Sequence, residues 1–421
     1  MSGRLRRIAI DVTPLRVSHD FRLLWTGSLI SAFGSQFVRV GLYVQVYALT
    51  GSPAQVGLLG VSALVGNIAG TFIGGSFIDA HDRRRVLIWA QVGHMAVSGW
   101  LVAGAIGGHP QLVLLHIANL LTWGLGAIDG AARQAATPRL VGTELMPSAV
   151  ALNQVLWQTT GIVGPALAGV LIARTSPTTA YAVDLVSYAG LLIAAIAIQP
   201  LPPLPSADGE RPVGVRAIRE GLRYVGRHRL IRSTFVIDLI AMIFGMPAAL
   251  FPVLAVQQFH RGPEVVGLLF AAPAVGALAQ LLVAGSVTRI RRQGEAVIWS
   301  VAGWGAAIAA FGLVGPHLGW ALLFLAVAGA ADVVSAIFRS TILQVSTPDA
   351  LRGRLGGIFL LVVSGGPRIG DLEAGLVAAA VSPTFSVVSG GLACIVGAFA
   401  CTIRYPELRR YDAGARPPAV A

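Results

Sequence analysis

The sequence is poor in charged side chains and contains no lysine. Charged residues make up 12% of the 421 residues, whereas an ordinary soluble domain carries roughly 25%. All 31 basic side chains are therefore arginines. This scarcity of charge excludes an ordinary water-soluble domain. The sequence also lacks a phosphate-binding glycine loop with lysine, a metal-ligand spacing and a nucleophile elbow, so we expect no enzyme, no cofactor and no metal.

Cysteine is scarce as well. Cys394 and Cys401 lie in the last apolar stretch; they are too few for a disulfide framework and are expected to fill space as small apolar side chains. The basic start, Met1–Arg7, is similar to the beginning of a signal peptide, but no short apolar run with a cleavage site follows before Phe21. We therefore expect residues 1–21 to form a cytoplasmic tail.

Long apolar runs are the main feature of the sequence. Hydrophobic residues make up 55% of the chain, and stretches such as Val56–Ile78 can cross a hydrocarbon layer of roughly 30 Å at about 1.5 Å per residue. Breaks at glycine, proline and charge predict an all-α polytopic membrane protein. Its twelve transmembrane helices are expected near residues 22–48, 54–78, 86–106, 111–131, 148–172, 180–199, 234–257, 264–287, 295–314, 319–341, 356–380 and 384–403.

The arginines predict how these helices are oriented. If the first tail is cytoplasmic, the outside loops hold only Arg174 and Arg261, and the inside loops hold Arg83, Arg84, Arg85, Arg133, Arg139, Arg289, Arg291, Arg292, Arg352 and Arg354. Short cytoplasmic loops are enriched in basic residues, so both termini are expected on the cytoplasmic side of the cell (inner) membrane. The net charge of +12 then reflects topology, and no nucleic-acid partner is expected.

Two dipeptides each recur later in the chain, and the distance between the two copies is the same for both. Gly-Ser begins the loops at Gly75 and Gly285, and Thr-Pro begins at Thr137 and Thr347. Both offsets are 210 residues (285 − 75 and 347 − 137). We therefore expect two six-helix pseudo-repeats related by an axis along the membrane normal. They comprise residues 22–199 and 234–403, joined by a cytoplasmic linker at 200–233 and followed by a cytoplasmic tail at 404–421.

The linker contains a helical pattern. Ile218, Leu222 and Val225 fall on one face of that helix, and the arginines of the segment fall elsewhere: Arg216, Arg219, Arg223 and Arg227. The pattern predicts either an amphipathic helix on an anionic lipid surface or a plain linker.

The loop at Gly75 carries a recognisable motif, in which Asp79 follows four residues on and Arg83 and Arg84 come next. With this motif and the repeat, the chain from about Phe21 to Tyr405 resembles the major facilitator superfamily and is expected to have its fold. The resemblance implies that Gly75 allows close helix approach and that Asp79, Arg83 and Arg84 form a conformational latch between the two halves. Ala80 and Asp82 depart from the usual motif.

Two further motifs narrow the resemblance. Gly164, Pro165 and Gly169 are similar to an exporter motif, in which small residues pack tightly and proline bends the helix. The runs Asp129–Val141 and Gln344–Arg354 look like the branch of drug:proton antiporters that includes macrolide exporters and the enterobactin exporter. The resemblance implies proton-driven efflux of an amphipathic small molecule, such as a drug or a siderophore, by alternating access. The expected partners are that substrate, protons and the bilayer, and the expected state is a monomer.

Charge at membrane depth is costly, so ionisable residues inside helices are functional candidates. The eleventh helix concentrates them, because Arg368 and Asp371 are three positions apart and can meet on one face, whereas Glu373 points elsewhere. A carboxylate that loses its cationic partner and its water favours the neutral form. We predict that Asp371 or Glu373 carries a proton with Arg368 as its partner. Structural packing of the helix is the alternative.

In the resembling fold, helices 1, 4, 7 and 10 line a central cavity. Candidate substrate contacts on these helices are Arg39, Gln45, Asn119, Trp123, Met242, Met246 and Asp332. Trp and Met adapt to varied apolar ligands, and Arg39 could receive an acidic group. A packing or lipid-facing role is the alternative for each.

The sequence alone does not exclude several other functions. Uptake or lipid flipping would use the same fold. A membrane-embedded enzyme would need catalytic acids or histidines clustered at one membrane face, and a sensor would bind a ligand without moving it. Flux across the membrane distinguishes these functions.

Overall fold

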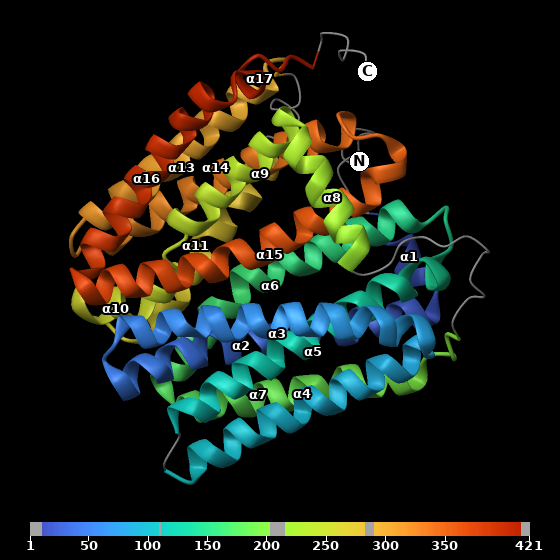
Figure 1. Cartoon of the computed structure of the whole chain (residues 1–421). Helices are drawn as coiled ribbons and strands as arrows, with labels where there is room; N and C mark the ends of the chain where they lie inside the picture. The colour runs from blue at the N-terminus through green and yellow to red at the C-terminus, as the bar shows by residue number, and fades with distance from the viewer. Residues whose placement is uncertain (1–10, 109–110, 203–214, 283–289, 414–421) are drawn as a thin grey trace, which may run out of the picture. The chain divides into compact units, whose positions relative to one another are not determined.

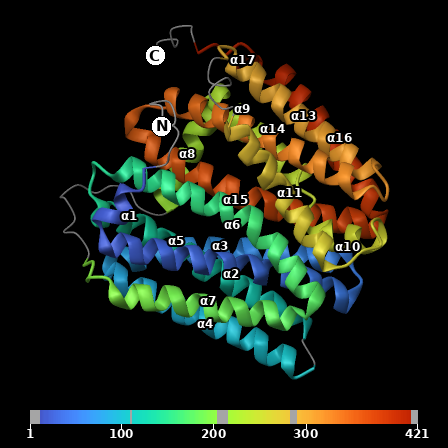
Figure 2. The same ribbon diagram turned by 180° about the vertical axis from the view of Figure 1, so that it is seen from behind.

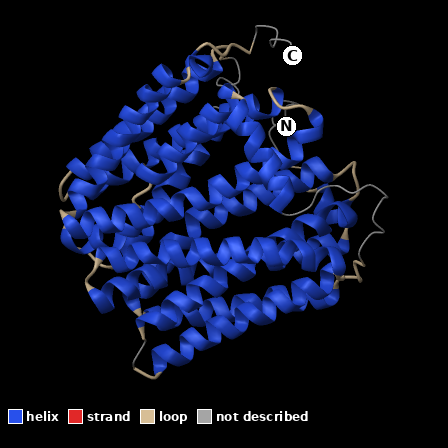
Figure 3. Cartoon of the chain, viewed as in Figure 1, coloured by secondary structure: helices blue, strands red, loops and turns tan. Residues whose placement is uncertain are grey.

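A computed structural model describes residues 11–108, 111–202, 215–282 and 290–413, and every regular element in these ranges is a helix (Figure 3). The helices are α1 (Thr13–Val17), α2 (His19–Thr50), α3 (Pro53–Ala80), α4 (Arg83–Ile106), α5 (Leu112–Val141), α6 (Met146–Arg174), α7 (Pro177–Ala197), α8 (Val215–Arg227), α9 (Arg229–Phe244), η2 (Ala248–Leu250), α10 (Phe251–Gln257), α11 (Pro263–Leu282), α13 (Gln293–Leu313), α14 (Leu318–Val345), α15 (Asp349–Ala380), α16 (Pro383–Arg404) and α17 (Pro406–Arg409).

Eleven of the described helical spans are long and apolar enough to cross a membrane, with the segment Arg229–Gln257 taken as one of them. The chain is therefore a multi-pass membrane protein. The first predicted span corresponds to α2, which is not among the eleven. The number twelve stays a prediction.

Local sequence accounts for several helix starts. Proline occupies the first helical position of α3, α7 and α16, where its missing N–H removes no intrahelical bond. Asp82 precedes α4 and accepts a hydrogen bond from the Arg84 amide (2.8 Å). Ser382 caps α16 in the same way by accepting from the Phe385 amide (3.1 Å). These caps satisfy amides that a helix start leaves without partners.

The chain divides into two compact units: unit 1 contains Met1–Gln45 and Val65–Gly209, and unit 2 contains Val46–Leu64 and Glu210–Ala421. In unit 1, α4 packs along α5 and α7, and α4 and α7 lie side by side in Figures 1 and 2. In unit 2, α13 packs between α14 and α16, and α11 packs on α14. The boundaries of the predicted bundles, 22–199 and 234–403, stay a prediction.

Glycines allow close helix contacts in both units. A Cβ atom added to Gly66 of α3 would clash with the carbonyl oxygen of Leu120 in α5. A Cβ atom added to Gly276 of α11 would clash with the carbonyl oxygen of Ala326 in α14. The two glycines are 210 residues apart (276 − 66), the spacing of the predicted repeat. This parallel agrees with the repeat, which itself stays a prediction.

One predicted helix is broken. The sequence predicted a continuous helix at 234–257, but α9 ends at Phe244, and η2 and α10 follow from Ala248 onward. Pro247 explains the interruption, since proline lacks an N–H group and its ring clashes with the preceding turn. The indole Nε1 of Trp304 donates a hydrogen bond to the carbonyl oxygen of Gly245 (3.0 Å), so one backbone group freed by the break is paired.

The linker helix α8 is present, but its apolar residues do not share one environment. Val225 is buried in a cluster of unit 2 that also contains Ile231, Phe235, Leu343, Leu355 and Ile358. Leu222 is exposed, as are Arg219, Arg223 and Arg227. The side chain of Ile218 lies outside the described residues. The side chain of Val225 packs on protein, and the placement of the helix on a lipid surface stays a prediction.

Candidate functional site

Two of the predicted proton-coupling residues, Arg368 and Asp371, lie together, and Asp371 contacts the break in the α9–α10 segment. Asp371 of α15 is 1% exposed, and its Oδ1 accepts a hydrogen bond from the Ala249 amide of η2 (3.0 Å). Its Oδ2 lies 3.4 Å from Nη1 of Arg368. The structure therefore brings Arg368 and Asp371 together as the i, i+3 spacing predicted. Glu373 is half-buried, and it forms no ion pair with a residue in the described ranges.

Helix α3 packs closely against the Cβ atom and the main chain of Asp371. A Cβ atom added to Gly60 of α3 would lie 2.8 Å from the Asp371 Cβ atom, and one added to Gly57 would lie 2.6 Å from the Asp371 carbonyl oxygen. Residues 46–64 belong to unit 2, so this packing is internal to that unit. Asp371 therefore sits among backbone groups that leave it little room to move.

A second set of buried charges in unit 2 joins α9 to α14. Arg339 is 2% exposed and forms an ion pair with Asp238, which is 1% exposed. Asp332, one of the predicted substrate contacts, has Oδ1 3.7 Å from Nη2 of Arg339, which is too long for a hydrogen bond. Two carboxylates thus share one guanidinium group, and the fully ionised cluster has a net charge of −1.

Unit 1 contains two buried acids of its own. Asp129 lies 2.5 Å from Nη2 of Arg133 and accepts a hydrogen bond from Nε2 of Gln91 (2.8 Å). Asp184 accepts from the hydroxyl group of Ser98 (2.5 Å). Asp129 is therefore paired with a cation. Among the described residues, Asp184 forms no ion pair, and its Oδ1 has no hydrogen-bond partner.

The predicted substrate contacts fall in both units. Arg39 and Trp123 are half-buried and Asn119 is buried. Gln45 is buried too, and its side-chain oxygen accepts a hydrogen bond from the hydroxyl group of Tyr181. These four residues belong to unit 1. For Gln45 the hydrogen bond supports the packing alternative.

The other three candidates belong to unit 2. Met242 is buried against α15, where a Cβ atom on Gly366 would meet its side chain at 2.7 Å. Met246 is half-buried in the break after α9, and Asp332 is half-buried beside Arg339. One site shared by all seven residues stays a prediction.

Two predicted latch residues form hydrogen bonds with the end of α7 and the segment after it. Nε of Arg84 donates to the carbonyl oxygen of Ala195 (3.2 Å), and its Nη2 donates to that of Ile196. Nη1 of Arg83 donates to the carbonyl oxygen of Pro202 (3.0 Å). All of these bonds lie inside unit 1. The side chain of Asp79 lies outside the described residues, and no atom is within 4 Å of a Cβ added to Gly75.

The exporter motif lies in the middle of α6, and Gly164, Pro165 and Gly169 are all buried. A Cβ atom added to Gly164 would lie 2.7 Å from Cγ of Gln36 in α2. The lack of a side chain at Gly164 therefore leaves room for Gln36 of α2, and the role of the motif in export stays a prediction.

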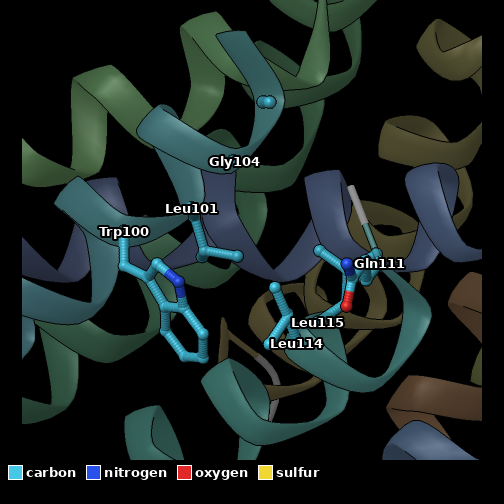
Figure 4. A pocket seen from close by; sticks show the side chains of 7 residues that line it. Trp100, Leu101, Gly104, Gln111, Leu114 and Leu115 are labelled. Carbon is cyan, nitrogen blue, oxygen red and sulfur yellow. The ribbon is translucent and has the colours of Figure 1, made fainter. Parts of the chain in front are cut away.

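Figure 4 shows a notch between α4 and α5 that Trp100, Leu101, Gly104, Gln111, Leu114 and Leu115 line. Its volume of about 20 Å³ holds one water molecule at most. This notch cannot accept an organic substrate. In the described ranges, no group of three His, Cys, Asp or Glu side chains is arranged to hold a metal ion.

The chain is similar to known proteins over nearly its whole length. Residues 10–419 match the family described as transmembrane secretion effector. The chain is 26% identical over 415 residues to the enterobactin exporter EntS of Citrobacter koseri, covering 98% of this chain and 97% of that protein. It is 25% identical over 406 residues to EntS of Shigella boydii serotype 18, covering 96% and 95%.

Solved structures share the fold. A variant of the nucleoside transporter NupG has a TM-score of 0.73 at 14% identity and covers 92% of this chain and 100% of its own. A bacterial homologue of the iron transporter ferroportin in an inward-facing state has a TM-score of 0.67 at 17% identity, with coverages of 93% and 99%. At these identities the likeness concerns the fold alone.

Proposed function

Because the chain belongs to the transmembrane secretion effector family of the major facilitator superfamily, we propose that it exports an amphipathic small molecule from the cytoplasm by alternating access, driven by proton influx. The chain is a membrane transporter and not an enzyme. The observation that carries the proposal is the full-length similarity to proteins named as enterobactin exporters. A siderophore-like compound or a drug of similar amphipathic character is therefore the proposed substrate class.

The surroundings of Asp371 support proton coupling. Its ionised form attracts Arg368 across 3.4 Å in a nearly fully buried position. Protonation removes that attraction but leaves Oδ1 able to accept from the Ala249 amide. Loss of the proton restores the pair. A change in the protonation of Asp371 can thus break or form the ion pair with Arg368 while the hydrogen bond with the Ala249 amide persists.

The proposed placement is the cell membrane with both termini in the cytoplasm. Inside-out vesicles with an imposed proton gradient test export directly, with dyes, antibiotics and siderophores as probes. Export predicts accumulation that an uncoupler abolishes. Substrate that instead moves into whole cells down the gradient would establish uptake, and binding without flux would establish a sensor. Transbilayer movement of labelled phospholipid in the same vesicles would establish lipid flipping.

A further inference from the structure

A cavity of about 390 Å³ lies between the C-terminal end of α14 and the first half of α15, inside unit 2. Its lining residues are Ser340, Leu343, Gln344, Thr347, Leu355, Gly356 and Phe359. Small-molecule sites in proteins have volumes of roughly 300–1,000 Å³. The cavity is therefore large enough for a small organic molecule, unlike the notch between α4 and α5. By the arginine distribution, this end of the helices is the predicted cytoplasmic one.

The lining combines an apolar wall with uncharged polar groups. Leu343, Leu355 and Phe359 supply the apolar wall, and they also contact the cluster that holds α8. None of the described lining residues is charged. These residues suit the neutral, carbon-rich part of a ligand.

Besides the volume of the cavity, the side chain of Thr347 also indicates a ligand. The residue is 4% exposed, and its Oγ1 is buried with no hydrogen-bond partner among the described residues. A buried hydroxyl group without a partner is destabilising. Ser340 differs, because its hydroxyl group donates to the carbonyl oxygen of Ile337 (2.9 Å). Thr347 thus places in the cavity wall a hydroxyl group that no described residue pairs with and that a ligand could pair with.

We propose that this cavity is a cytoplasmic access site, which binds the exported compound before alternating access begins. The inference rests on the proposed export function. The chemical class that fits is an uncharged amphipathic molecule with an aromatic or aliphatic body and a hydroxyl, carbonyl or amide group within reach of Thr347. The sequence offered no sign of this site, because its members are ordinary apolar and small polar residues brought together by packing.

Two neighbouring glycines provide a matched test. A Cβ atom on either Gly356 or Gly357 would meet no other atom within 4 Å, both residues are exposed, and only Gly356 lines the cavity. Gly356→Leu and Gly357→Leu therefore change helix propensity alike, but only the first fills the cavity. Radiolabelled chloramphenicol, an uncharged amphipathic probe, is measured for equilibrium binding to purified full-length protein and for flux in inside-out vesicles.

The site predicts that Gly356→Leu weakens chloramphenicol binding by about tenfold or more, which is about 1.4 kcal/mol, and that Gly357→Leu leaves it within about twofold. Equal effects of the two variants, or no saturable binding by the unmodified protein, would overturn the site. The export function fails in a different way: if the proton gradient drives no flux while Gly356→Leu still weakens binding, the site stands and proton-driven export does not.

Thr347→Val separates a ligand site from a packing defect. The substitution removes the unpartnered hydroxyl group with little change in volume. A ligand site predicts weaker chloramphenicol binding together with a higher melting temperature of the unliganded protein, since an unsatisfied polar group is lost. A higher melting temperature with unchanged chloramphenicol binding would show that the cavity is only a packing defect.

Discussion

The Asp371 side chain accepts a hydrogen bond from the Ala249 amide, with 3.0 Å between Oδ1 and the nitrogen atom. One carboxylate therefore joins α15 to the backbone that follows the interruption after α9. Interrupted membrane helices leave backbone groups that need partners. The same side chain faces Arg368 through its other oxygen, so one carboxylate contacts both the interrupted segment and the cation of α15.

The first prediction separates the charge of Asp371 from its role as an acceptor. Asp371→Asn keeps a side-chain oxygen for the Ala249 amide but cannot bind and release a proton. We expect the variant to fold with a lowered melting temperature, because Arg368 loses a buried partner, and to lose flux driven by a proton gradient. Flux is measured in inside-out vesicles with and without the gradient.

Two comparison variants complete that experiment. Asp371→Ala also removes the acceptor, and the orphaned amide should destabilise the protein by about 1–3 kcal/mol. Glu373→Gln tests the other predicted carrier, which is only half-buried. Gradient-driven flux that persists in Asp371→Asn, in Glu373→Gln and in the double variant would rule out proton coupling by α15.

A second prediction concerns the buried ion pair between Asp238 and Arg339. Removing one partner of a buried pair leaves an uncompensated charge and costs about 3–5 kcal/mol, whereas replacing both with apolar residues of similar size is often near neutral. Asp238→Asn should therefore lower the melting temperature more than Asp238→Leu combined with Arg339→Met does. Thermal unfolding in detergent measures both.

Asp332 modifies that expectation. It lies 3.7 Å from Arg339 and remains as a partner in Asp238→Asn, so the single loss should fall at the lower end of the range. Asp238→Asn with Asp332→Asn together should cost more than the sum of the two single changes. Additive effects would mean that Asp332 does not interact with Arg339.

The third prediction tests close packing of α3 on α5. A Cβ atom on Gly70 would clash with the carbonyl oxygen of Gly124, whereas one on Gly99 of α4 would meet no atom within 4 Å. Gly70→Ala should therefore destabilise the protein by about 1–3 kcal/mol through overpacking. Gly99→Ala should stabilise it by up to about 1 kcal/mol through helix propensity. Melting temperatures that shift in the same direction would contradict this reading.

Much of the fold can be predicted from the sequence, because a membrane helix is recognisable from its own continuous run of apolar residues. A run such as Val86–Ile106 must be helical in lipid, and the observed α4 begins three residues earlier, at Arg83. The pairing of Arg368 with Asp371 is likewise local, since three positions bring two side chains onto one helical face. Short-range rules of this kind need no knowledge of neighbouring helices.

The rest depends on contacts between segments far apart in the chain. The sequence contains Gly245 and Pro247 at the break, but proline is tolerated in many membrane helices, so the sequence alone does not predict an interruption there. The hydroxyl group of Tyr181 binds Gln45 from 136 positions away, which ranks packing above substrate contact for that residue. Nothing in the sequence around Thr347 signals a cavity. Long-range packing decides these features.

The fourth prediction decides between two roles of Arg84. In the structure its guanidinium group binds carbonyl oxygens in the last turn of α7, a position where a cation satisfies unpaired acceptors and favours the helix dipole. Arg84→Gln should then lower stability by about 1–3 kcal/mol. Arg85→Gln, at an exposed neighbouring position, should change stability by less than about 0.5 kcal/mol.

A latch between the two halves requires a different outcome. Such a latch acts on the balance between inward-open and outward-open states, so Arg84→Gln would change the rate of flux while leaving the melting temperature within error. Accessibility of single cysteines introduced on the two predicted sides of the membrane reports that balance. A fall in stability without a change in cysteine accessibility assigns Arg84 to anchoring α7, because those bonds are confined to unit 1 and hold the helix end in either state.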